Sequence, residues 1–228
     1  MNNPEKRPFR IFDATTLKLI AIIAMFMDHL GYTLYPNMPW LRMVGRLTFP
    51  IMAFFIAQGA SKTRDRRKYF LRLLVFAVIS EAPFDLMLSG QLFSLRHQNV
   101  LFTLALGLLG CFMVENLKQG VKVLPSVMLL AALILSGELL AADYGMLGVL
   151  LVVLFYVFKN QKSGILQAGF LGNGAMSVMF SSATQLWGFA AIPLLYMYNG
   201  QRGSGFKYLF YIFYPLHMLL LWLLPRIA

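Results

Sequence analysis

Residues 15–35 read TTLKLIAIIAMFMDHLGYTLY, and this stretch decides the class of fold. A helix needs about 20 mostly apolar residues to cross a hydrocarbon core of about 30 Å, and this run meets that requirement. Across the 228 residues, 59% are hydrophobic and only 13% are charged, with a mean hydropathy of +0.67. An ordinary soluble domain carries about 25% charged residues. The sequence therefore predicts an all-α fold, a polytopic helical bundle in a membrane.

The apolar runs predict about nine transmembrane helices. Eight or ten stay open, because the stretch 121–198 is apolar with only short breaks. Residues 1–14 are expected to form a polar segment before the bundle, and 15–228 a single transmembrane domain. The first run lacks a small-residue cleavage site, so we expect this helix to be retained. The nine expected spans are 15–35, 43–60, 69–89, 99–117, 121–140, 143–158, 164–180, 183–198 and 206–224.

The net charge of +11 follows the membrane topology. With nine spans, 16 of the 20 basic residues fall on one side, and Lys and Arg collect on the cytoplasmic side of membrane proteins. The sequence thus predicts a multi-pass protein of the cytoplasmic membrane with its N-terminus inside. It argues against nucleic-acid binding, because the basic residues lie at the ends of apolar runs. The four on the other side are Arg42, Arg46, Arg96 and Arg226.

Asp28 and His29 lie well inside the first expected span. Ionisable groups are expensive at membrane depth, so such a pair is a functional-site hypothesis by default. The structural alternative is that each satisfies a neighbouring helix. They do not easily pair with each other, because adjacent helical residues point about 100° apart. An imidazole is the side chain best able to move protons near neutral pH.

More polar groups are expected near the same depth, toward the outer face. Two interpretations remain open: a purely architectural charge network between helices, or a polar cavity that carries chemistry. Two pairs, Arg42 with Arg46 and Glu81 with Asp85, are spaced four apart and so share a helical face. The others are Arg96, His97, Gln98, Asn99, Thr103, Asp143, Tyr144 and His217.

Several motifs are absent from the sequence. It contains no Walker loop, no nucleotide-binding glycine fingerprint, no HExxH and no cysteine pair. The single Cys111 sits in an apolar run and is expected to be a core residue. We therefore expect no metal site.

The motifs along the chain resemble the TraX family. They are FDATTLKLIAIIAMFMDHLGYTLYP from residue 12, LRMVGRLTFPIMAFFIAQG from 41, TRDRRKYFLRLL from 63, ISEAPFDL from 79, QNVLFTLALG from 98, ADYG at 142–145 and FYPLHMLLL from 213. The family is named for the protein that acetylates the N-terminus of F-type pilin, and it is similar to a wider group of transmembrane acyltransferases. The resemblance implies a bacterial membrane enzyme that uses acetyl-CoA from the cytoplasm. Its acceptor would be an amine or hydroxyl at the outer face, on pilin or an envelope glycan.

Combining this resemblance with the intramembrane polar residues gives a candidate site. His29 would act as general base or as a transient acyl carrier, with Asp28 or Glu81 orienting it. Arg46 and Asn99 would stabilise negative charge on the thioester carbonyl. His97 and His217 are reserve candidates. A basic segment would hold the phosphates of acetyl-CoA, or would serve only as a topology signal; its residues are Arg64, Arg66, Arg67, Lys68 and Arg72.

Two other functions compete with acetyl transfer. The same residues suit a proton-coupled transporter of a small molecule, although no inverted repeat is visible. The charges also suit a non-enzymatic assembly factor that binds a partner membrane protein. Lipid, acyl-CoA and a protein or glycan acceptor are the expected partners, and a homo-oligomer stays open.

Overall fold

The computed structural model describes residues 10–120, 122–161, 163–205 and 207–227, and these residues are mainly helical. They contain isolated β-bridges but no named strand. The all-α prediction is confirmed. The expected segment 1–14 falls largely outside the described residues. The helices are α1 (Ala14–Thr33), α2 (Pro39–Gly45), α3 (Thr48–Lys62), α4 (Arg66–Ser89), α5 (Val100–Lys118), α6 (Val123–Leu139), α7 (Gly145–Val157), α8 (Gly164–Met179), the 3-10 helix η1 (Ala183–Ala190), α9 (Ala191–Tyr196) and α10 (Lys207–Ile227).

Three helix starts are fixed by side chains that cap them. The Asp13 carboxylate accepts a hydrogen bond from the Thr16 amide at 2.7 Å and begins α1. Asp65 does the same for α4, and Asn99 for α5. Such caps satisfy amide groups that lack an intrahelical partner. These local signals explain why the expected and observed helix starts agree within a few residues.

Two of the expected spans are each built from two helical pieces. The expected span 43–60 is interrupted at Arg46 and Leu47, between α2 and α3. Pro50 has no backbone N–H, so the Arg46 carbonyl lacks its usual partner four residues later, which favours a break there. The expected span 183–198 is divided into η1 and α9.

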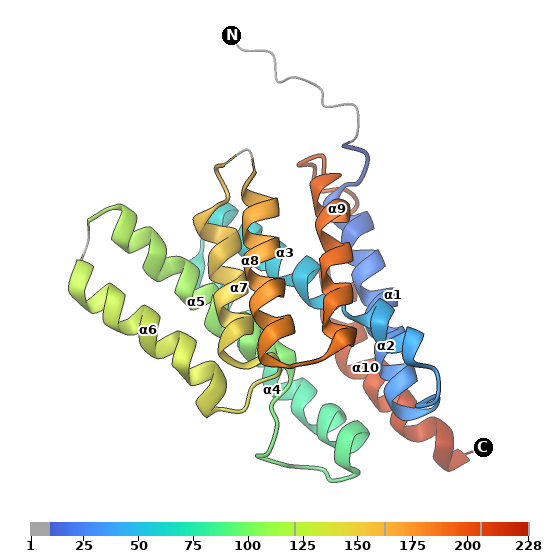
Figure 1. Ribbon diagram of the computed structural model, residues 1–228. Coiled ribbons are helices and arrows are strands. Elements are labelled where there is room, and N and C mark those ends of the chain that lie inside the picture. The colour runs from blue at the N-terminus through green and yellow to red at the C-terminus, as the bar shows by residue number, and fades with distance from the viewer. Residues whose placement is uncertain (1–9, 121, 162, 206, 228) are drawn as a thin grey trace.

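Helix α3 lies in the middle of the bundle and packs against α1, α5 and α7. Helix α10 packs against α1 and α4, so the two ends of the chain sequence meet in one helix pair. Figure 1 shows α6 at one edge of the bundle, beside α5, with α1, α2 and α10 on the opposite side.

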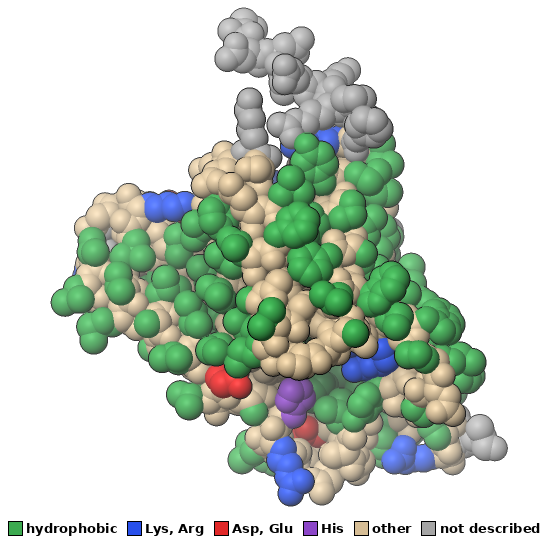
Figure 2. Space-filling view, in the orientation of Figure 1, with side chains coloured by type: hydrophobic (Ala, Val, Ile, Leu, Met, Phe, Trp, Pro, Cys, Tyr) green, Lys and Arg blue, Asp and Glu red, His purple; other side chains and the backbone are tan. Residues whose placement is uncertain are grey.

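The outer surface suits lipid. Hydrophobic side chains are spread widely over the face seen in Figure 2, and charged ones are sparse there. On α6, Leu124 is 70% exposed and Leu139 is 84% exposed. Four described segments are long and apolar enough to cross a bilayer: Ala14–Thr33, Pro39–Lys62, Val100–Lys118 and Leu209–Arg226. The chain is thus an integral membrane protein, and nine crossings stay a prediction.

Candidate active site

Asp28 on α1 binds two arginines at once. Its Oδ2 lies 2.7 Å from Arg42 Nη1, and its Oδ1 lies 2.8 Å from Arg46 Nη2. Arg42 and Arg46 are four residues apart and approach the carboxylate from the same side, as their spacing predicts. The Asp28 side chain is only 14% exposed. A charge this buried is retained when it is paired, and here one anion holds two cations.

Gly45 makes this close approach possible. A Cβ atom at Gly45 would overlap the side chain of Asp28. Glycine at this position lets the backbone of α2 press against α1 and brings both guanidinium groups within reach.

His29 has a partner from the far end of the sequence. Its Nδ1 lies 2.7 Å from Nε2 of His217 on α10, and Nδ1 of His217 lies 2.8 Å from the carbonyl oxygen of Phe213. A carbonyl only accepts, so His217 donates from Nδ1. With both rings neutral, His217 Nε2 then accepts from His29 Nδ1, and His29 Nε2 keeps a free lone pair. The partner of His29 is thus a histidine, where we had expected a carboxylate.

Asp28 and His29 line a cavity of about 290 Å³ that runs between α1, α3, α4 and α10. We call the region of Asp28, His29, Thr48 and Tyr144 its histidine end. The opposite region, which we call the basic end, contains Lys18, Arg72 and Arg202.

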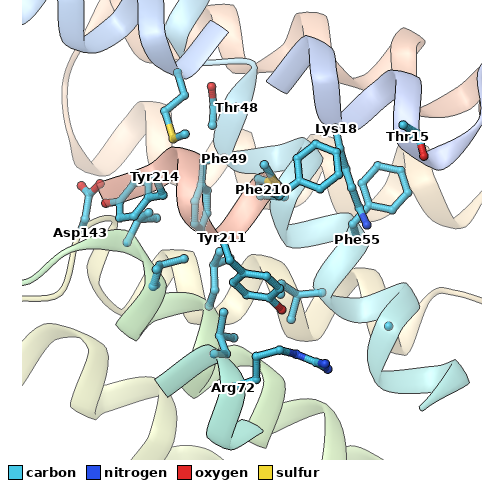
Figure 3. Close-up of a pocket in the computed structure, with 18 of the residues that line it drawn as sticks. Thr15, Lys18, Thr48, Phe49, Phe55, Arg72, Asp143, Phe210, Tyr211 and Tyr214 are labelled. Atoms are coloured by element: carbon cyan, nitrogen blue, oxygen red, sulfur yellow. The ribbon is translucent and has the colours of Figure 1, made fainter. Parts of the chain in front are cut away.

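Aromatic side chains occupy the middle of the cavity. In Figure 3, Asp143 and Tyr214 lie at one side and Lys18 and Phe55 at the other, with Phe49 and Tyr211 between them. Lys18 and His29 are eleven residues apart on α1, which corresponds to about 16 Å along the helix axis. One cavity therefore joins groups that lie at different depths of the bundle.

A second cavity, of about 410 Å³, lies on the other side of Tyr144. Asp143 and Tyr144 line both cavities, and Arg46 Nη1 is 3.4 Å from the Tyr144 hydroxyl oxygen. His97 Nε2 lies 3.7 Å from Asp143 Oδ1. The nearby Asp143 carboxylate raises the pKa of His97 above its ordinary value, against an opposing effect of burial. His97 thus belongs to the second cavity, not to the histidine end.

Glu81 and Asn99 form a separate buried pair. Asn99 Nδ2 donates to Glu81 Oε2 and to the Ala77 carbonyl oxygen at 2.8 Å. Asn99 also caps α5 through its other side-chain atom. Neither residue lines the cavity that contains His29. Of the five predicted catalytic residues, the structure brings together Asp28, His29 and Arg46, and it places Glu81 and Asn99 between α4 and α5.

The predicted cofactor-binding segment is likewise divided. Arg64, Arg66, Arg67 and Lys68 are exposed, and Lys68 pairs with Asp65 at 3.3 Å. Only Arg72 of this set lines the cavity. The positions of the first four suit a topology signal at least as well as a binding site.

Three residues are closer to the candidate site in the structure than the sequence predicted. His217 was a reserve candidate, yet it holds His29. Lys18 and Arg202 are among the 16 basic residues on the predicted cytoplasmic side, yet they line the cavity. Lys18 did carry a signal, because it lies inside the apolar run 15–35 and not beside it. Within the described ranges, no group of three or more His, Cys, Asp or Glu residues is placed to hold a metal ion.

Comparison with known proteins identifies the family. The profile of the TraX protein family matches residues 13–225. A probable fimbrial assembly protein FimC, serogroup H1, of Dichelobacter nodosus is 34% identical over 92% of this chain and 94% of its own length. An uncharacterized protein, RP591, of Rickettsia prowazekii (strain Madrid E) is 26% identical over 65% of this chain and 57% of its own length. No solved structure matches. The chain belongs to the TraX family.

Proposed function

We propose that this protein is a membrane-embedded acetyltransferase that moves an acetyl group from cytoplasmic acetyl-CoA to an amine or hydroxyl at the outer side of the cytoplasmic membrane. One observation supports the proposal most directly: a single cavity connects the basic end with His29. The hydrogen bond to His217 leaves the lone pair on Nε2 of His29 free to accept a proton. By the charge asymmetry of the sequence, the basic end faces the cytoplasm, where acetyl-CoA is made.

His29 is the general base in this proposal. Its Nε2 takes the proton of the acceptor, and the acceptor nitrogen or oxygen attacks the thioester carbonyl carbon. The new C–N or C–O bond forms as the C–S bond breaks, and the CoA thiolate takes up the proton from His29. His217 is a positioning residue, since its Nε2 fixes the tautomer and orientation of the His29 ring.

In this proposal the Tyr144 hydroxyl stabilises the carbonyl oxygen as it gains charge, and Arg46 supports Tyr144. The Tyr144 oxygen accepts from Arg46 at 3.4 Å, which leaves its own hydroxyl proton for a ligand in the cavity. We assign this role to Tyr144 in place of Asn99, because both side-chain groups of Asn99 are occupied by other partners. Asp28 keeps Arg46 in position.

The acceptor would enter through the second cavity, which shares Asp143 and Tyr144 with the first. The name of the Dichelobacter relative refers to fimbrial assembly, and this supports a fimbrial subunit as the acceptor. The same name also favours the rival function of a non-enzymatic assembly factor. In that case the charges around Asp28 would serve only to join helices and to bind a partner.

The test is transfer of labelled acetyl from acetyl-CoA, measured with purified protein in detergent and with fimbrial subunits or a short peptide with a free N-terminus as acceptor. We expect the wild type to transfer label and His29→Gln to lose roughly 10²- to 10⁴-fold in rate, the usual contribution of a general base. Lys118→Gln is the matched control, since Lys118 is exposed at the end of α5 and lines neither cavity.

The two functions give different results. A wild type that transfers no acetyl group but still binds fimbrial subunits would support the assembly factor. A His29→Gln variant with full transfer and normal expression would overturn the assignment of the base. Label retained on the protein after removal of acetyl-CoA would make His29 an acyl carrier.

A further inference from the structure

The three cations of the basic end come from three different parts of the chain. Lys18 is on α1, Arg72 is on α4, and Arg202 is in the loop between α9 and α10. The Thr15 hydroxyl holds this loop against α1 through hydrogen bonds to the carbonyl oxygens of Arg202, at 3.1 Å, and Ser204, at 2.6 Å. The fold therefore gathers the three cations at one end of the cavity.

These cations have no anionic partner among the described residues. None of the three forms a salt bridge within the described ranges. Asp13 lies near the same loop, but its carboxylate caps α1 by accepting from the Thr16 amide. Two other described carboxylates at this side of the bundle also have cationic partners: Asp65 pairs with Lys68, and Glu115 pairs with Lys159.

Arg72 is the most informative of the three. Its Nε is buried and has no hydrogen-bond partner in the described part of the chain. Its guanidinium lies 5.7 Å from the ring of Tyr69 and 5.9 Å from the ring of Tyr211. A buried polar group without a partner is costly, and an arginine fork fits phosphate oxygens well. The orphaned N–H indicates a ligand that accepts hydrogen bonds.

Lys18 is held in a similar way. Its Nζ lies 5.1 Å from the ring of Phe55 and 5.6 Å from the ring of Phe210. In Figure 3, the side chains of Lys18 and Arg72 both extend into the cavity, on the side away from Asp143. Aromatic faces steady a cation but leave its N–H groups free to donate.

We propose that Lys18, Arg72 and Arg202 form the binding site for the diphosphate of acetyl-CoA, an inference that rests on the acetyl transfer proposed above. The acetylated arm of the donor would then extend past Phe49 toward His29. The site differs from the exposed segment that the sequence predicted, of which it keeps only Arg72.

The experiment is calorimetric titration of purified protein in detergent with CoA, with inorganic pyrophosphate as competitor. We expect Arg72→Gln and Lys18→Gln each to weaken CoA binding about tenfold or more, as expected for a lost charged hydrogen bond. Arg202→Gln should weaken it less, because Arg202 is exposed to solvent. S-acetylpantetheine, which lacks the phosphates, should bind equally well to all variants.

Arg67→Gln is the matched control, because Arg67 is exposed on the same helix and lies outside the cavity. Arg72→Lys keeps the charge and guards against a folding defect, and it should retain part of the affinity. Loss of CoA binding in Arg67→Gln but not in Arg72→Gln or Lys18→Gln would overturn the site, as would a wild type that binds no CoA. If CoA binds with the expected variant pattern but no acetyl group is transferred, the site stands and the acetyltransferase proposal fails.

Discussion

The two ends of the cavity differ in whether their charged side chains have partners within the protein. At the histidine end every charged group has a partner: Asp28 binds Arg42 and Arg46, and His29 is held by His217. At the basic end, Lys18 and Arg72 have aromatic neighbours but no described carboxylate.

This difference separates two tasks. Buried pairs hold side chains in fixed positions, which is what a reacting group needs. Cations without partners cost stability and are retained where a ligand supplies the missing anion. The paired end is organised by the protein itself, and the other end is completed by what it binds.

The largest expected effect comes from removing the anion of the paired end. Asp28→Ala leaves Arg42 and Arg46 without a carboxylate and makes this end resemble the basic one. We expect a loss of roughly 3–5 kcal/mol in the free energy of unfolding, the usual cost of breaking a buried ion pair. Thermal unfolding of the protein in detergent measures it.

Asp65→Asn is the control for that experiment, because asparagine removes the charge but can still cap α4. Asp65 also pairs with a cation, but its side chain is 47% exposed and that of Lys68 is 84% exposed. Exposed pairs contribute little, so this variant should unfold close to the wild type. Equal unfolding temperatures for the two variants would mean that the Asp28 cluster does not stabilise the fold.

A pair of glycines tests the same contrast through packing. Gly45→Ala places a methyl group against Asp28, whereas a Cβ at Gly205, which lines the cavity beside the basic end, meets nothing within 4 Å. We expect Gly45→Ala to lose about 1–3 kcal/mol, as overpacked cores do, and Gly205→Ala to unfold like the wild type. Similar losses in both would show that the histidine end is no more tightly packed than the basic end.

His217 tests whether the pairing at the histidine end orients the base. His217→Ala removes the acceptor for His29 Nδ1. We expect kcat to fall by an amount that corresponds to about 1 kcal/mol, the net value of one hydrogen bond. The KM for acetyl-CoA should change little. His217→Gln offers an amide oxygen that can accept from His29 and should restore part of the rate. A purely structural role would lower stability in both variants and leave the rate per folded molecule unchanged.

The sequence was sufficient for the features that depend on nearby residues. The shared face of Arg42 and Arg46 was predicted from their spacing of four residues. The caps at Asp13 and Asn99 are equally local, with spacings of three and two residues, although they were not among the predictions. The interruption after Arg46 has a local cause as well, because Pro50 removes one backbone donor.

The features that depend on helix packing could not be predicted from the sequence. His29 and His217 are 188 residues apart in sequence, and nothing in either segment says that α1 lies against α10. Arg202 enters the cavity only because its loop is tied to Thr15. Glu81 and Asn99 were grouped with His29 because of similar expected depth, and depth alone does not say which helices share a cavity.

The smallest expected effect concerns the pair of His97 and Asp143, at the ends of expected spans, where solvent weakens the charges. The nearby Asp143 carboxylate, together with the charges of Glu81 and Asp85, raises the pKa of His97 above its ordinary value of 6.5. A raised pKa in the folded protein means that the pair stabilises fully below the unfolded pKa, and that this contribution is lost as the pH rises through the folded pKa. Since both side chains are more than a third exposed, we expect the unfolding temperature of the wild type to fall only slightly above pH 6.5. The His97→Gln variant should show no such fall. Unfolding curves of the two proteins from pH 5.5 to 8.5 measure it. A fall as large as that caused by Asp28→Ala would contradict the view that burial, and not pairing alone, makes the histidine end rigid.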